Sequence, residues 1–356
     1  MNIESCPECG VPRLITGEQL WLNNGDIVQA RDRRSRILFL ETENLDPLFR
    51  GIEEIIGVPL ERMVIAASRR AYRVYLRAFV PGEVREKIAR REMDYEPIEA
   101  AFRELGALNG TGRYERVDMR FEGDDQDYDT VSISEPYSLP FCVAAHVGAI
   151  EALTGVDQGY SYEEVSPGLY HITTFPSPHP DELKGRLHFE PYEHREGGTE
   201  LEKCASCGGP RALSGFAWYP DRGVIVDRET GRRMCIQGNA LIQPVFDELE
   251  SELGDIIPRA VVEAQRRFTR SGFFGLADAV AGEENFRERL ALRGLGNLTE
   301  LVVKRRGMHV RVENAALPLM LVGIAQGFYE MGMSVDSSVD WQYHEDGVLE
   351  VEVRPR

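Results

Sequence analysis

The sequence lacks several features that assign proteins to large functional classes. It contains no apolar run of the roughly 18 residues that a membrane-spanning helix needs. It also has no surplus of positive charge, because 59 acidic residues outnumber 41 basic ones and give a net charge of -18. Binding to nucleic acid or to an anionic membrane surface requires a cationic surface. We therefore expect a protein that binds neither nucleic acid nor membranes.

The common catalytic signatures are also missing. The sequence has no Gly-x-Gly-x-x-Gly after a predicted strand, no P-loop, no Gly-x-Ser-x-Gly and no His-Glu-x-x-His. Only seven histidines occur, and no arrangement of serine, histidine and acidic residues indicates a catalytic triad. The first residues have no cationic segment followed by an apolar run, so no secretion signal is predicted and we expect a cytoplasmic protein.

Cysteine is scarce, but its placement is informative. Two short segments, Cys6-Pro-Glu-Cys9-Gly and Cys204-Ala-Ser-Cys207-Gly, each place two thiols three residues apart and continue to Pro-Arg. A tight turn of this kind can hold two sulfur atoms on one metal ion, and the glycine lets backbone N–H groups point at sulfur. In a reducing compartment such pairs favour metal binding over structural disulfides. We predict Zn²⁺, with an iron–sulfur cluster or a redox-active dithiol as alternatives.

Each cysteine pair supplies two ligands, whereas a structural zinc site needs four. The remaining cysteines, Cys142 and Cys235, lie at unrelated places in the two halves, and no histidine of one half matches a histidine of the other. We therefore predict one site that all four paired cysteines share. Alternatively, the missing ligands are histidines between the halves, such as His188 or His194, or come from a second chain. A site with four thiolates has no open coordination position, so it is structural.

The two halves match beyond their cysteine pairs. Glycines and aromatic residues recur in the same order, Arg69-Arg70 recurs as Arg266-Arg267, and Leu139-Pro140 recurs as Leu317-Pro318. Matches that keep their order over a whole half indicate an internal duplication. The prediction is two homologous repeats related by a pseudo-twofold axis. Their predicted bounds are 1–178 for the first repeat, 179–200 for a linker rich in Pro, His and Gly, and 201–356 for the second repeat.

The predicted fold class is α+β, with an antiparallel sheet, helices and an N-terminal Cys-x-x-Cys knuckle in each repeat. Gly148, Gly323 and Gly327 weaken the apolar helices, so we expect a close approach of another element there. The acidic segment 123–129 is predicted to be a solvated loop. The elements predicted for the first repeat are a hairpin over 19–41, two helices with a break at 57–59, a helix over 83–105, strands over 114–121 and 130–133, an apolar helix over 138–155 and a hairpin over 160–174.

Five side chains are candidates for contacting a small molecule. His146 lies in the apolar helix, where it is either hydrogen-bonded locally or contacts a ligand. Glu151 and Glu330 occupy matching places on the two apolar helices, either at an exposed edge or facing a pocket. Arg69 and Arg266 end matching apolar stripes, which favours solvated helix ends or ion pairs over the binding of an anionic ligand.

The latter part of each half has a recurring order: a helix, a glycine-containing turn, two strands, an apolar helix and a hairpin. The turns are Leu105-Gly-Ala-Leu-Asn-Gly110 and Leu295-Gly-Asn-Leu298, and the second apolar helix reads Leu317-Pro-Leu-Met-Leu-Val-Gly-Ile-Ala-Gln-Gly-Phe-Tyr-Glu330. This order resembles the four-vinyl-reductase domain family over about 100–175 and 283–354. The resemblance implies a small α+β ligand-binding domain, as found in aromatic-sensing bacterial regulators and in bacteriochlorophyll synthesis.

One difference limits that resemblance. Cysteines that the family often carries in its closing strands are replaced here by Asp340-Trp341-Gln342-Tyr343. The resemblance therefore transfers no metal ligand and no catalytic residue. The sequence predicts a zinc-binding, non-catalytic protein that binds a small hydrophobic or aromatic molecule or a partner protein as an accessory or scaffold, with homo-oligomerisation as an option. The alternative is a metal- or cofactor-dependent enzyme, or a subunit of one.

Overall fold

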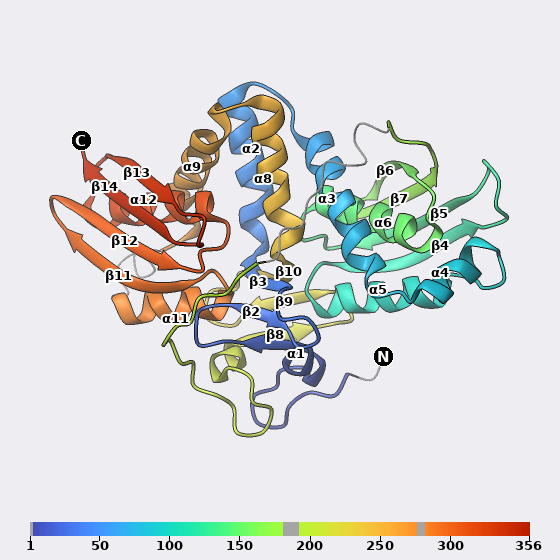
Figure 1. Cartoon of the computed structure of the whole chain (residues 1–356), viewed down its shortest axis with the longest axis horizontal. Coiled ribbons are helices and arrows are strands. Elements are labelled where there is room, and N and C mark those ends of the chain that lie inside the picture. Colours follow the sequence, from blue (N-terminus) through green and yellow to red (C-terminus); the bar gives the residue numbers. More distant parts are fainter. Residues whose placement is uncertain (1–2, 181–191, 276–281) are drawn as a thin grey trace.

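The computed structural model describes residues 3–180, 192–275 and 282–356. Three antiparallel sheets and the helices packed on them make up an α+β fold (Figure 1). The elements up to residue 178 are α1 Arg13–Glu18, β1 Gln19–Trp21, β2 Ile27–Gln29, β3 Arg36–Glu41, η1 Thr42–Asn44, α2 Leu45–Ile56, α3 Glu61–Arg77, α4 Gly82–Ala89, α5 Glu96–Leu108, β4 Arg113–Arg120, β5 Tyr128–Ser134, α6 Leu139–Thr154, β6 Gln158–Ser166 and β7 Leu169–Pro176.

The second half follows a similar order in its described residues, although η2 stands in place of α1 and η1 has no counterpart there. They are η2 Arg211–Gly215, β8 Phe216–Tyr219, β9 Val224–Asp227, β10 Arg233–Gly238, α8 Asn239–Leu253, α9 Ile256–Phe268, η3 Thr269–Phe273, α11 Glu283–Arg293, β11 Asn297–Lys304, β12 Gly307–Glu313, α12 Pro318–Met333, β13 Ser337–Tyr343 and β14 Leu349–Pro355. The hairpins, strand pairs and apolar helices predicted from the sequence overlap these elements, with bounds that differ by a few residues. The predicted linker, 179–200, is described only outside residues 181–191.

The central sheet takes three strands from each half. Its order is β1-β2-β3-β10-β9-β8, and β3 pairs with β10 antiparallel at its centre, where Phe39 lies opposite Ile236. Each half also has a four-stranded sheet of its own, with the orders β4-β5-β7-β6 and β11-β12-β14-β13. In Figure 1 these two sheets flank the helices α2 and α8, which stand side by side above the central sheet.

The helices between the sheets join the two halves in one core. In α2 the buried residues Leu45, Leu48, Phe49 and Ile52 follow helical spacing, so the helix presents one apolar face. Phe49 stacks on Phe246 of α8, with ring centroids 5.6 Å apart. Helix α2 packs on α9, and α3 packs on α8. Helices α2 and α3 therefore bury part of their apolar faces against the other half, while α3 also packs on α6, and α9 on α12, within their own halves.

The tips of two hairpins reach across to the opposite half. Gly25 between β1 and β2 has φ +79°, and its carbonyl accepts a hydrogen bond of 3.2 Å from Gly296. Gly223 between β8 and β9 has φ +68°, and its carbonyl accepts one of 2.9 Å from Gly112. A Cβ at either tip would lie about 2 Å from the facing carbonyl, so only glycine fits both the turn and the contact.

The predicted single helix over 83–105 is wrong. Two helices occur instead, α4 and α5, with a break in which Arg91 has φ +62°. Pro97 lies in the first turn of α5, where its missing N–H costs nothing, whereas in mid-helix it would remove a hydrogen bond. The Asp94 carboxylate also accepts a hydrogen bond from the Glu96 backbone at 2.8 Å, which starts α5.

The acidic segment 123–129 is a solvated loop only in its first part. Residues 123–127 connect β4 to β5, but Asp129 lies within β5 and is 1% exposed. Its Oδ2 accepts a hydrogen bond of 2.9 Å from the Tyr95 hydroxyl and lies 3.3 Å from the Arg116 guanidinium. A buried carboxylate needs such partners, and the charge pattern of the segment alone does not reveal them.

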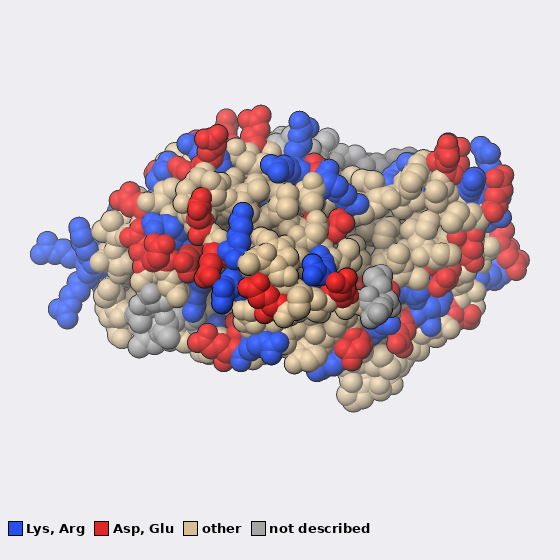
Figure 2. Space-filling view, turned by 90° about the horizontal axis from the view of Figure 1, so that it is seen from below, with Lys and Arg blue, Asp and Glu red and all other residues tan. Residues whose placement is uncertain are grey.

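Charges of both signs lie next to one another on the face seen from below (Figure 2). Ion pairs with exposed side chains also occur, such as Arg222 with Glu135 at 2.8 Å. Of the helices in the described ranges, none combines the length and the apolar composition that a membrane crossing requires.

Candidate metal centre and ligand cavity

The first cysteine pair lies in a tight turn closed by backbone hydrogen bonds. The N–H of Gly10 donates to the Cys6 carbonyl at 2.9 Å, and the N–H of Cys6 donates to the Val11 carbonyl at 2.8 Å. Gly10 has φ +74°, a conformation that glycine adopts without strain. The sequence Cys-x-x-Cys-Gly therefore folds locally into a knuckle with both side chains on its inner side.

The second pair adopts the same turn. The N–H of Gly208 donates to the Cys204 carbonyl at 2.9 Å, and the N–H of Cys204 donates to the Gly209 carbonyl at 2.8 Å. Gly208 also has φ +74°. The two knuckles thus have matching backbone geometry, as their matching sequences predict.

The two knuckles face each other, and their four Sγ atoms lie within 4.8 Å of one another. The Sγ atoms of Cys6 and Cys204 are 3.7 Å apart, and those of Cys9 and Cys207 are 3.6 Å apart. A disulfide requires about 2.05 Å, so these are free thiols. Sulfurs around one zinc ion, with bonds of about 2.3 Å, are about 3.8 Å apart. The four cysteines can therefore bind a metal ion such as zinc.

The protein itself favours ionisation of one of these thiols. The backbone N–H of Cys9 points at the Cys6 sulfur and lowers the pKa of Cys6 to about 6. Burial instead raises the pKa of Cys9 to about 12. A bound dication reverses such a burial effect, because a coordinating thiol loses its proton.

The residues considered as additional ligands lie elsewhere or outside the described ranges. The ring nitrogens of His194 lie 2.7 Å from Asp26 Oδ2 and 2.7 Å from the Arg33 carbonyl oxygen. His188 lies outside the described residues. Cys142 is buried, donates to the Thr111 carbonyl at 3.4 Å and has a pKa raised to about 12 by burial. Cys235 is buried in β10.

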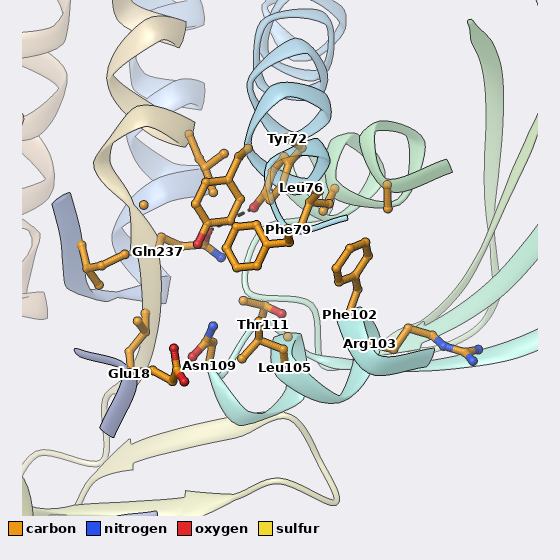
Figure 3. A pocket seen from close by; sticks show the side chains of 18 of the residues that line it. Glu18, Tyr72, Leu76, Phe79, Phe102, Arg103, Leu105, Asn109, Thr111 and Gln237 are labelled. Atoms are coloured by element: carbon orange, nitrogen blue, oxygen red, sulfur yellow. Dashed lines mark hydrogen bonds between the residues drawn. The ribbon is translucent and has the colours of Figure 1, made fainter. Parts of the chain in front are cut away.

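A cavity of about 330 Å³ lies between α3, α5, α6 and the end of β10. The labelled side chains Phe79, Phe102, Leu105, Thr111 and Gln237 point toward one common space (Figure 3). Its wall comes from both halves, because β10 and α8 of the second half contribute residues. Among the lining residues are Leu14, Glu18, Gln19, Gln29, Arg31, Tyr72, Tyr75, Phe79, Phe102, Asn109, Tyr114, Tyr137, Ala145, His146, Gln237 and Leu241.

Hydrogen bonds hold the inner end of the cavity in place. The Tyr72 hydroxyl donates to Gln237 Oε1 at 3.1 Å and lies 3.1 Å from the Tyr137 hydroxyl. Burial raises the pKa of Tyr72, so its hydroxyl stays protonated. Because Tyr72 comes from α3 and Gln237 from β10, this group fixes the two halves to each other at the cavity.

His146 lines this cavity and is 4% exposed. Its Nε2 faces the Asp129 carbonyl at 3.4 Å, and a carbonyl oxygen can only accept, so Nε2 carries the proton. Burial lowers the pKa of His146 to about 4. The histidine is therefore neutral at physiological pH.

The other four candidate side chains form buried ion pairs away from the cavity lining. Glu330 is 2% exposed and accepts from Arg266 at 2.6 Å and from the Ser337 backbone at 2.9 Å. Glu151 is 1% exposed and lies 3.9 Å from Arg69. Of the two alternatives for the glutamates, the exposed helix edge is wrong, since both carboxylates are buried. Each links its apolar helix to an earlier helix and to the following strand: Glu151 to α3 and β6, and Glu330 to α9 and β13.

The sequence patterns did not predict most of the residues in the cavity wall. Tyr72, Tyr75 and Phe79 follow Arg69-Arg70 at spacings that place them on one side of α3 and its extension. That aromatic stripe was the available signal. No local pattern, however, indicates that Gln237 from the other half completes the wall.

Comparisons with known proteins leave the family open. No protein-family model matches the chain, and no curated protein matches it. One solved structure matches part of the chain, a Cs H-NOX mutant with the unnatural amino acid 4-cyano-L-phenylalanine at site 5. The match covers 39% of this chain and 81% of the H-NOX chain, with 14% sequence identity and a TM-score of 0.26. A match at this level assigns neither a family nor a function to the chain.

Proposed function

We propose that this protein binds a small hydrophobic or aromatic molecule in the cavity beside α3, and that a zinc ion in the four-cysteine site holds its two halves together. The observation that carries the proposal is the cavity of about 330 Å³ with its aromatic wall. Ligand pockets usually occupy about 300–1,000 Å³ and combine apolar lining with a few polar groups. A cavity of about 150 Å³ already holds benzene, so two fused rings fit here.

Polar groups in the cavity wall support a binding site for a small molecule rather than an empty packing defect in the hydrophobic core. Gln19 and Asn109 line the cavity, and their side-chain oxygens Oε1 and Oδ1 are buried without a hydrogen-bond partner within the described ranges. Such atoms cost free energy unless a ligand or water pairs with them. His146 is the one sequence-derived ligand candidate that the proposal retains.

Zinc is proposed over an iron–sulfur cluster because of the sulfur spacing. Sγ distances of 3.6 and 3.7 Å across the knuckles suit four ligands on one ion. A cluster distributes its cysteines over different irons, which separates the sulfurs further. Four thiolates leave no open position for substrate, which supports a structural metal and a binding protein rather than a metal-dependent enzyme.

We also propose that the halves arose by duplication and are related by a pseudo-twofold axis between β3 and β10. The identical strand orders of the two four-stranded sheets support this, as do the matching knuckles. The order of helix, two strands, helix and hairpin in each half agrees with the proposed likeness to four-vinyl-reductase domains.

Calorimetric titration with 2-naphthol tests the binding proposal. We expect one molecule to bind per chain. Replacing Ala145, which lines the cavity on α6, by Phe fills the space and weakens binding at least about tenfold. The matched control is Ala101→Phe on the exposed side of α5, which should leave the affinity unchanged. Absence of binding by the wild-type protein, or equal binding by both variants, contradicts the proposal.

A further inference from the structure

Helix α1 lies between the cysteine cluster and the cavity. It has six residues and no side-chain cap, and an isolated helix of that length is unstable in water. Its conformation therefore depends on what it touches at either end. Those contacts are the first knuckle, the second knuckle and the cavity wall.

The knuckle side of α1 is fixed by three contacts. The N–H of Arg13 donates to the Glu4 carbonyl at 2.9 Å, so the first helical residue belongs to the hydrogen bonds of the first knuckle. Ile15 is 2% exposed in the core cluster that also contains Cys9 and Val11. Thr16 packs so tightly on the second knuckle that a Cβ at Gly209 would lie 2.6 Å from its Cγ2.

The opposite side of α1 forms part of the cavity wall. Leu14 and Glu18 line the cavity, and Gln19 follows directly in β1. The N–H of Ala30 donates to the Glu18 carbonyl at 2.9 Å, which links the end of α1 to the end of β2. Gln29 and Arg31 flank Ala30 and also line the cavity.

These wall residues contact the aromatic side chains of α3 directly. Gln29 Nε2 donates to the Tyr75 hydroxyl, and the Arg31 guanidinium lies 3.3 Å from the centroid of the Phe79 ring. A displacement of α1 would therefore move these wall residues relative to α3.

We propose that occupancy of the cysteine site by metal sets the affinity of the cavity, with α1 as the connecting element. This inference rests on the proposed function, because it needs both a metal at the cysteines and a ligand in the cavity. With metal bound, both knuckles hold α1 against the core and the wall is preformed. Without metal, the knuckles separate and the ligand must order α1 when it binds, which weakens binding.

Coupling of this kind acts in both directions, so the ligand raises the metal affinity by the same factor. Coupling between two sites typically changes an affinity by about 5- to 150-fold. We expect a value in that range, because one of several cavity walls depends on α1.

The first measurement compares the affinity of the zinc-loaded protein for 2-naphthol with the affinity of protein treated with a chelator. The second compares the affinity of the protein for zinc with and without 2-naphthol. We expect both affinities to change by the same factor, at least about fivefold. Equal 2-naphthol affinity with and without zinc overturns the inference but leaves the proposed function standing. Failure of the zinc-loaded protein to bind 2-naphthol overturns the proposed function.

Two variants keep the test decisive if the metal-free chain unfolds. Ile15→Ala loosens α1 while all four cysteines remain, and Leu213→Ala makes the corresponding change in η2, which does not line the cavity. At full zinc occupancy, Ile15→Ala should weaken 2-naphthol binding at least about fivefold, and Leu213→Ala should not change it. Hydrogen exchange at the Ile15 and Thr16 amides should accelerate in Ile15→Ala. Equal binding by both variants contradicts the role of α1.

Discussion

The Sγ atoms of Cys6 and Cys204 lie 3.7 Å apart, although 198 residues separate the two cysteines in the chain. Each knuckle alone supplies two of the four clustered sulfur atoms, and the fold brings the other two from the knuckle that precedes β8 in the other half of the chain. The same pairing of halves recurs at β3 and β10, at Phe49 and Phe246, and in the cavity wall. The cysteine cluster and the cavity are therefore both formed at the junction between the halves.

A glycine substitution tests the packing of α6 on α3. At Gly148 a Cβ would lie 2.6 Å from Tyr72 Cβ and 2.8 Å from the Arg69 carbonyl oxygen. We predict that Gly148→Ala lowers the free energy of unfolding by about 1–3 kcal/mol, because backbone atoms must move apart. Urea unfolding followed by circular dichroism measures this.

The matched control is Gly17→Ala in α1, where a Cβ meets nothing within 4 Å. Helix propensity then favours alanine, so we expect no loss of stability and a gain of up to about 1 kcal/mol. Equal effects of the two substitutions would show that α6 does not approach α3 as closely as described.

The buried carboxylate of Glu330 gives a second prediction. It accepts from Arg266 at 2.6 Å and from Arg270 at 2.8 Å, and its side chain is fully buried. Glu330→Gln leaves these arginines without a charged acceptor and should cost about 3 kcal/mol of stability. Glu345→Gln, an exposed position, should change stability by less than about 0.5 kcal/mol. A small effect at both positions argues against the buried pair.

The burial of His146 predicts how the free energy of unfolding changes with pH. Burial lowers the pKa of His146 in the folded state to about 4, whereas an exposed histidine titrates near 6.5. Between these values the unfolded chain binds a proton that the folded chain does not, so stability falls as the pH falls from about 6.5 to 4. The loss is of the order of 3 kcal/mol.

The His146→Phe variant isolates this effect. Glu99, Arg103, Arg116 and Asp129, which surround His146, remain in both proteins, so the difference between the two stability curves reports mainly on the histidine. We expect the wild type to lose stability relative to the variant below about pH 6.5 in chemical unfolding experiments. Parallel curves would indicate a solvated histidine.

Local patterns revealed much of the fold in advance. The cysteine spacing predicted both knuckles, Gly148 predicted a close helix contact, and the hairpin predicted over 160–174 is present as β6 and β7. These features depend on a few neighbouring residues whose conformation the chain settles locally. The predicted break at Gly57 is also present, since Gly57 ends α2 with φ +73°.

Relations between distant segments were harder to predict. Asp129 belongs to an acidic run, and only its contacts with Tyr95 and Arg116 explain its burial. Gln237 completes the cavity because β10 pairs with β3 of the other half. The clustering of the four paired cysteines was the exception, because a tetrahedral zinc site needs four ligands and each knuckle supplies two.

Metal analysis of single cysteine variants tests most directly whether the halves share one site. We predict about one zinc ion per chain in the wild type, and its loss in both Cys6→Ser and Cys204→Ser, although these residues belong to different knuckles. Cys142→Ala, a buried cysteine outside the cluster, should retain the ion. Two ions per chain, each lost in only one of the two serine variants, would contradict a shared site.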